Sequence, residues 1–160
     1  MKNKNIFKLF FVSMLFIMAC KAYVEEKEKI DSLSTVVSTL NNKIDHEKFN
    51  NYKQEINKLK ENLKDVGNAE LQEKLLKLQS LFQDKLAAKL EALKAAKQKI
   101  EGITDVDNST AKNKIWAESK LVGVTIKFSG SNTTGKGAEM SKEAVEQIEK
   151  IIKFLEEGTN

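Results

Sequence analysis

The chain has 160 residues, the size of a single domain, and its 41% hydrophobic and 31% charged residues are typical of a folded protein rather than a disordered one. The net charge is +4, but three lysines and no acidic residue lie in residues 1–19, so residues 21–160 carry only +1. This balance argues against nucleic-acid binding, which needs a basic excess on the folded part. The absence of arginine also argues against bidentate recognition of phosphate.

The N-terminal segment has the pattern of an export signal. Lys2, Lys4 and Lys8 lead into a short apolar run over residues 9–17, which matches the positive and apolar regions of a signal peptide. The run is far shorter than the ~20 residues that a helix needs to cross a bilayer. We therefore expect residues 1–19 to be a cleaved signal peptide rather than a permanent transmembrane anchor.

The four residues Ile17, Met18, Ala19 and Cys20 resemble the lipobox of bacterial lipoproteins. In that motif an aliphatic, a variable and a small residue precede a cysteine that is diacylated, exposed by cleavage and then N-acylated. Met18 departs from the tightest form of the motif, in which a small residue is usual, and is similar to the relaxed lipoboxes of spirochaetes. The resemblance implies lipidation of Cys20, and each buried acyl CH₂ would contribute ~0.8 kcal/mol to membrane binding. A free or buried cysteine that merely follows a signal peptide is the weaker interpretation.

The remainder of the chain is predicted to be all-α. After a lipidated tether over residues 20–24, apolar residues recur at spacings of three and four with no proline to interrupt them. We expect residues 25–160 to form one four- to five-helix bundle with long amphipathic helices. The first helix, over residues 25–44, has an apolar stripe of Ile30, Leu33, Val37, Leu40 and Ile44. The second begins after an N-cap at Asp45 and ends at Gly67, with a stripe of Phe49, Tyr52, Ile56, Leu59, Leu63 and Val66.

The third predicted helix is the longest and spans residues 69–101, with Asn68 as its N-cap and Gly102 at its end. Its core-facing stripe comprises Leu71, Leu75, Leu78, Phe82, Leu86, Leu90, Leu93 and Ile100. Beside the stripe lies a flank of small residues, Ala87, Ala88, Ala92, Ala95 and Ala96, which we expect to admit a second neighbouring helix.

The C-terminal third of the chain is predicted with two further helices. A polar loop over residues 103–110 leads into a segment, residues 111–127, that fits helical spacing but also alternates like a strand at residues 121–128. We favour a helix, because a lone strand leaves its backbone groups unpaired. After a polar loop over residues 129–137, Ser141 is expected to cap a final helix that ends at Gly158, with Met140 as a hydrophobic staple.

The sequence offers no convincing catalytic or cofactor site. The single histidine, His46, lies at a predicted helix junction beside Asp45, where a solvated capping-region histidine is favoured over a metal ligand. Residues 130–137 match most of the phosphate-binding loop motif, but Gly137 stands where the motif needs a hydroxyl, and no parallel strands are predicted around it. We therefore expect no enzyme activity, no metal and no cofactor.

Two surface features are candidates for partner binding. Five lysines in residues 85–99 are spread around the predicted helix circumference, which favours solvated charge over a polysaccharide site. Trp116, with Lys114 and Lys120 nearby, is a candidate anchor for a partner protein. A core position under a short helix is the favoured interpretation of Trp116.

The lipobox, the lysine-rich and arginine-free body and the lack of proline together resemble outer-surface lipoproteins of Borrelia-type spirochaetes, although no signature in the body identifies a subfamily. The resemblance implies a small helical protein anchored in the outer membrane through lipid on Cys20 and exposed at the cell surface. Its function would be that of an antigenic host-interaction module, with a host extracellular or serum protein as partner. The alternative is a structural or periplasm-facing lipoprotein that self-associates through coiled-coil helices. The sequence does not specify the oligomeric state.

Overall fold

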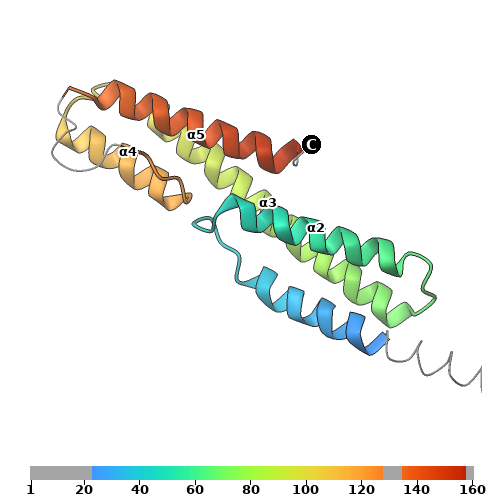
Figure 1. The fold of residues 1–160 in the computed structure, drawn as a ribbon. Coiled ribbons are helices and arrows are strands. Elements are labelled where there is room, and N and C mark those ends of the chain that lie inside the picture. Colours follow the sequence, from blue (N-terminus) through green and yellow to red (C-terminus); the bar gives the residue numbers. More distant parts are fainter. Residues whose placement is uncertain (1–22, 128–134, 158–160) are drawn as a thin grey trace, which may run out of the picture.

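The computed structural model describes residues 23–127 and 135–157, and these contain five helices and no strand. They are a helix over residues 23–38, α2 (His46–Leu63), α3 (Ala69–Glu101), α4 (Ser109–Leu121) and α5 (Gly137–Glu157) (Figure 1). The all-α prediction is confirmed.

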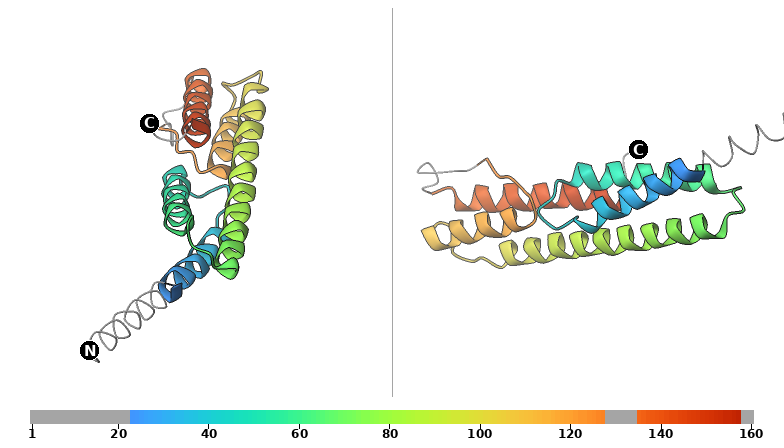
Figure 2. Two further views of the ribbon diagram at one scale, coloured as in Figure 1. Left: turned by 90° about the vertical axis from the view of Figure 1, so that its right-hand side faces the viewer. Right: turned by 90° about the horizontal axis from the view of Figure 1, so that it is seen from below.

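The long helix α3 is the axis of the molecule. Its 33 residues correspond to about 50 Å of helix. The 23–38 helix and α2 lie along its N-terminal half, whereas α4 and α5 lie along its C-terminal half (Figures 1 and 2). Two three-helix bundles therefore share α3 and form an elongated molecule.

The two halves of the molecule meet through α2 and α5, which follow each other along α3 (Figure 1). At their junction the His46 ring contacts the Phe154 ring edge-on, with 5.1 Å between centroids. Phe49 and Phe82 pack beside each other in the core, with ring centroids 6.4 Å apart. One hydrophobic core runs through both halves, and it contains the predicted stripes of the first three helices almost completely.

The first helix differs from its predicted bounds. It already includes Tyr23 and Val24 and ends at Ser38, six residues before the predicted end. The hydroxyl groups of Ser38 and Thr39 donate to the carbonyl oxygens of Thr35 and Val36, at 2.6 and 2.7 Å. These side-chain bonds compete with helical backbone bonds, and the N–H groups of Thr39 and Leu40 donate to the carbonyls of Val36 and Val37 in turns that close the helix.

Helix α2 begins as predicted and ends four residues before Gly67. The Asp45 carboxylate accepts from the Glu47 N–H at 2.9 Å and caps the N-terminus. At the other end the Gln72 side-chain amide donates to the carbonyl oxygens of Leu63 and Val66. A side chain from α3 thus satisfies the groups that the end of α2 leaves open.

Helix α3 has its predicted bounds, with Asn68 as N-cap and Gly102 as C-cap. Its stripe is buried except at one position, where Leu90 is only partly buried and Lys89 is buried instead. The predicted alanine flank is wrong in part: Ala96 is buried and Ala92 partly buried, whereas Ala87, Ala88 and Ala95 are exposed.

The prediction of helix through Lys127 is wrong, because α4 ends at Leu121. Gly123 takes a φ of 70°, and the N–H groups of Gly123 and Val124 donate to the carbonyls of Lys120 and Ser119. This is a Schellman motif, in which a left-handed glycine ends the helix. Residues 122–127 then run without secondary structure, with Val122, Val124 and Ile126 buried and the residues between them exposed. The alternation seen in the sequence is therefore real, although no ladder forms.

Helix α5 begins at Gly137, four residues before the predicted cap at Ser141, and Met140 is a buried helical residue rather than a staple. The Asp107 carboxylate accepts from the Gly137 N–H at 2.9 Å, so the loop before α4 caps α5. A Cβ at Gly137 would lie 1.8 Å from the Val106 carbonyl oxygen. Only glycine permits this contact. The predicted end at Gly158 lies outside the described residues.

Candidate functional surface

The predicted lipobox, Ile17, Met18, Ala19 and Cys20, lies outside the described residues, as does the rest of the predicted signal peptide. None of the described helices combines the length and the apolar composition needed to span a bilayer.

Helix α4 is positioned by a short row of small and aliphatic residues. Ala111, Ile115 and Ser119 are buried at spacings of four, and the Ser119 hydroxyl donates to the Ile115 carbonyl at 2.8 Å. Trp116 follows Ile115 and is therefore turned about 100° away from the buried side. Its exposed fraction is 44%, so the prediction of a core tryptophan is wrong.

The outward side of α4 carries apolar and basic side chains together. We define the α4 face as Lys114, Trp116, Ala117, Lys120 and Leu121, all of which are exposed. The Lys120 ammonium lies 4.8 Å from the centroid of the Trp116 ring, a cation–π contact. Leu121 is 49% exposed and was not singled out in the sequence. The spacing of the buried residues 111, 115 and 119 would have placed it on the outer side.

The acidic residue of α4 does not join this face. Glu118 turns toward α3, where its carboxylate pairs with Lys99 at 3.2 Å. Neither Lys114 nor Lys120 forms an ion pair with any of the residues that the structure describes. The α4 face therefore has a local positive charge although the folded part of the protein is nearly neutral.

A second distinctive feature is a buried lysine where the two halves of the molecule meet. Lys89 of α3 is 1% exposed, and its ammonium donates to the carbonyl oxygens of Asn42, Ile44 and Val122 at 2.5, 3.1 and 2.7 Å. These carbonyls come from the connection before α2 and from the end of α4. We call this group, Lys89 with its three carbonyls, the waist.

The waist changes the protonation of its lysine. Burial lowers the pKa of Lys89 from 10.5 to about 8, and the negative charge of nearby Asp45 opposes part of that shift. Gly123, just after α4, allows the backbone to lie close to the connection before α2. A Cβ at this position would lie 2.5 Å from the Lys43 carbonyl oxygen. Sequence reasoning missed Lys89, although it continues the spacing of the buried residues 82, 86 and 93.

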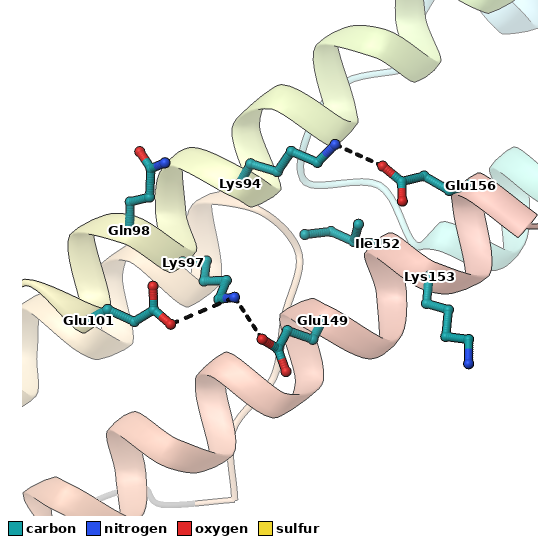
Figure 3. A pocket seen from close by; sticks show the side chains of 8 residues that line it. All are labelled: Lys94, Lys97, Gln98, Glu101, Glu149, Ile152, Lys153 and Glu156. Carbon is teal, nitrogen blue, oxygen red and sulfur yellow. Dashed lines mark hydrogen bonds and ion pairs between the residues drawn. The ribbon is translucent and has the colours of Figure 1, made fainter.

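A groove of about 430 Å³ lies between α3 and α5 and is lined by charged side chains (Figure 3). Lys94 pairs with Glu156 at 2.7 Å, and Lys97 pairs with Glu149 at 2.6 Å and with Glu101 at 3.7 Å. The hydrogen bond that the Lys97 ammonium donates to the Glu149 carboxylate raises the pKa of Lys97 above its ordinary value. The lysine and glutamate charges compensate one another across the two helices, so this groove orients α5 on α3 rather than offering a charged ligand site.

The remaining candidates from the sequence are His46 and the segment 130–137. His46 is partly exposed beside Asp45, with 3.1 Å between Nδ1 and Oδ1. No group of three metal-ligating side chains occurs within residues 23–127 and 135–157. Most of the segment 130–137 lies outside the described residues, and Gly137, its last position, is packed against the backbone of Val106 as the first residue of α5.

Fold and surface together define the class: an elongated all-α bundle with a basic, tryptophan-containing outer helix. The chain belongs to the family described as Borrelia burgdorferi REV protein, whose model matches residues 1–157. A crystal structure of a Rev protein from Borrelia burgdorferi is similar, with 66% identity and a TM-score of 0.80, over 84% of this chain and 97% of that chain. No curated protein matches the chain. The predicted resemblance to Borrelia proteins is thus confirmed, with Rev as the subfamily.

Proposed function

We propose that this Rev-family chain is a lipoprotein of the Borrelia outer membrane that displays its helical bundle at the cell surface as a host-interaction module. The observation that carries the proposal is the sequence Ile17, Met18, Ala19, Cys20, placed directly after a basic and apolar signal segment. Lipid on Cys20 supplies the anchor.

The arrangement of the helices supports a defined orientation on such an anchor. The described part of the chain begins at the end of the molecule that contains the connection between α2 and α3. Lys27 of the 23–38 helix pairs there with Glu70 in the first turn of α3, at 2.6 Å. From there α3 extends for about 50 Å. An anchor at Cys20 would hold this end near the membrane and place α4, the start of α5 and the loop between α3 and α4 on the distant half (Figure 1).

The self-associating alternative has less support, whereas surface proteolysis is what distinguishes the surface role from a periplasm-facing one. The apolar stripes that could form an intermolecular coiled coil are already buried within one chain, with Ile30, Leu33 and Val37 of the 23–38 helix and Leu59 of α2 at most 6% exposed. No such seam therefore remains on these two helices for a second copy.

Cell fractionation and surface proteolysis test the proposal. The wild-type chain and the Cys20→Ala variant are expressed in Borrelia, labelled with radioactive palmitate and separated into membrane and soluble fractions, and intact cells are treated with protease. Lys58→Ala, an exposed change on α2, is the matched control. We expect the wild type and the control to be labelled, membrane-bound and degraded from outside, and the Cys20→Ala variant to lose label and anchor.

Each opposite result has a definite meaning. Anchoring without Cys20 would show that the signal segment is retained and would contradict lipid anchoring. A wild-type chain that is anchored but protected from protease in intact cells would replace the surface role by a periplasm-facing one.

A further inference from the structure

The α4 face is the part of the described surface where large apolar side chains and unpaired positive charges coincide. We propose that it is a docking surface for an acidic polypeptide segment that also carries apolar side chains. The inference rests on the proposed function, because it assigns the partner class and the contact residues of the host-interaction module.

Three exposed apolar residues, Trp116, Ala117 and Leu121, lie on the α4 face. At 100° per residue these three side chains cover an arc of about 140° on the outer side of α4, with the small Ala117 between two large neighbours. Trp116 is the only tryptophan of the chain, and 44% of it is exposed. An exposed tryptophan beside an exposed leucine is typical of an interface centre, where aromatic anchors dominate binding.

Two lysines lie on the same side of α4: at 100° per residue Lys120 falls between Trp116 and Ala117, and Lys114 falls about 20° beyond Leu121. Their ammonium groups are exposed and have no carboxylate partner among the described residues, and Glu118 is held by Lys99 on the inner side. The contact with Lys120 orients the Trp116 ring and keeps the positive charge beside it. Carboxylates of a partner would therefore pair with these two lysines while its apolar side chains cover the ring and Leu121.

This combination favours a polypeptide over a sulphated polysaccharide. A polysaccharide would neutralise the two lysines but would leave Leu121 uncovered, and two lysines provide only a small part of a polyanion site. A polypeptide can satisfy both kinds of side chain at the same time.

Trp116 makes the experiment direct, because its fluorescence reports on the proposed surface alone. The full-length protein, extracted in detergent, is titrated with a random copolymer of glutamate and tyrosine, with polyglutamate and with heparin. For variants that replace Trp116, binding is measured instead by the fluorescence anisotropy of a dye-labelled copolymer. We expect a saturable change in Trp116 fluorescence with the copolymer and weaker binding of polyglutamate and heparin.

Matched variants locate the binding. The Lys114→Glu/Lys120→Glu variant is expected to lose about tenfold or more in affinity, and Trp116→Ala and Leu121→Ser several-fold each. The charge control is Lys58→Glu/Lys60→Glu on α2, and the apolar control is Leu76→Ser, a position 63% exposed on α3. We expect both controls to bind like the wild type, and all variants to keep their helical circular dichroism.

Several results would overturn the inference. Equal losses in the controls, or equal binding of polyglutamate that Leu121→Ser does not affect, would show unspecific charge attraction. Preference for heparin would make the surface a polysaccharide site. The result is independent of the anchoring test: a surface-exposed chain without copolymer binding would contradict only the docking surface, and binding by a protease-protected chain would contradict only the surface role.

Discussion

At the scale of single residues, Lys89 is a charge in the protein interior that has backbone carbonyls as its acceptors. Its ammonium has three N–H donors, and each is matched by one carbonyl of the waist, so that the lysine joins α3 to two segments that are far apart in sequence. Full hydrogen bonding of a buried charge offsets much of the cost of removing it from water. The lowered pKa shows that part of this cost remains.

The pH dependence of stability follows from that pKa. Below about pH 8 the folded and unfolded chains both carry the Lys89 charge, and the cost of burying it is fully present. Between about pH 8 and 10.5 the unfolded chain keeps a proton that the folded chain has released, so Lys89 adds stability as the pH rises. We expect this gain to total about 3 kcal/mol.

A comparison with Lys89→Met isolates this contribution. The variant leaves three buried carbonyls without a donor, and we expect it to lose about 2–4 kcal/mol of unfolding free energy at neutral pH. Urea denaturation of both proteins at several pH values should show the gap between them widening as the pH rises above 8. The exposed Lys58→Met serves as control. A constant gap would contradict the burial of a charged Lys89.

Gly137 offers a second test at residue scale. An alanine there would press its Cβ onto the Val106 carbonyl, which must then move together with the Asp107 cap. We expect Gly137→Ala to lower the free energy of unfolding by about 3 kcal/mol. Gly67→Ala, at a site with no atom within 4 Å, should change it by less than about 1 kcal/mol. Thermal unfolding of the two variants measures the difference, and equal losses would contradict the close contact between α5 and the loop before α4.

At the scale of helices, the sequence correctly predicted the helix ends that are fixed by capping residues close to them in sequence. Asn68 and Gly102 bound α3 as expected, and Asp45 caps α2, because these caps act within three residues of the helix end. Gly123 is also a local signal, and its role as the end of α4 was available from the sequence. The start of α5 was not, because its cap, Asp107, lies 30 residues away in sequence.

The α4 face and the waist likewise combine features set by local sequence with features set by distant segments. Helical spacing places Trp116 on a different side of α4 from Ala111, Ile115 and Ser119. The sequence of α4 does not specify which of these two sides is buried. That depends on α3 and α5, which pack on the side of Ala111, Ile115 and Ser119. The waist likewise depends on two distant segments that meet Lys89, and no pattern within α3 specifies the acceptors.

The core face of α3 provides the prediction at this scale. Phe82 is 3% exposed against Phe49, so Phe82→Asp would place a charge without a partner in the core, and we expect the domain to unfold. Leu86→Asp should act in the same direction. Lys85→Glu, on the neighbouring and more exposed side of the helix, should be nearly neutral. Circular dichroism with thermal melting separates the two classes, and equal tolerance of both would show that the assigned face is wrong.

At the scale of the whole molecule, α3 links two three-helix bundles into one elongated body with a continuous core (Figure 2). Because the stripes of the 23–38 helix and α2 are buried within the chain, we expect the detergent-extracted protein to be a monomer. Light scattering coupled to size exclusion, corrected for bound detergent, measures its mass. A stable trimer or tetramer would favour the self-associating alternative.

The proposed orientation and the proposed surface role both depend on lipidation of Cys20. Mass spectrometry of the N-terminal peptide, from the protein purified from Borrelia membranes, tests it most directly. We expect a mature chain that begins at Cys20 and carries a diacylglyceryl group on the sulphur and an acyl chain on the amino group. A chain that still begins at Met1, or one that begins near residue 20 with an unmodified cysteine, would contradict it.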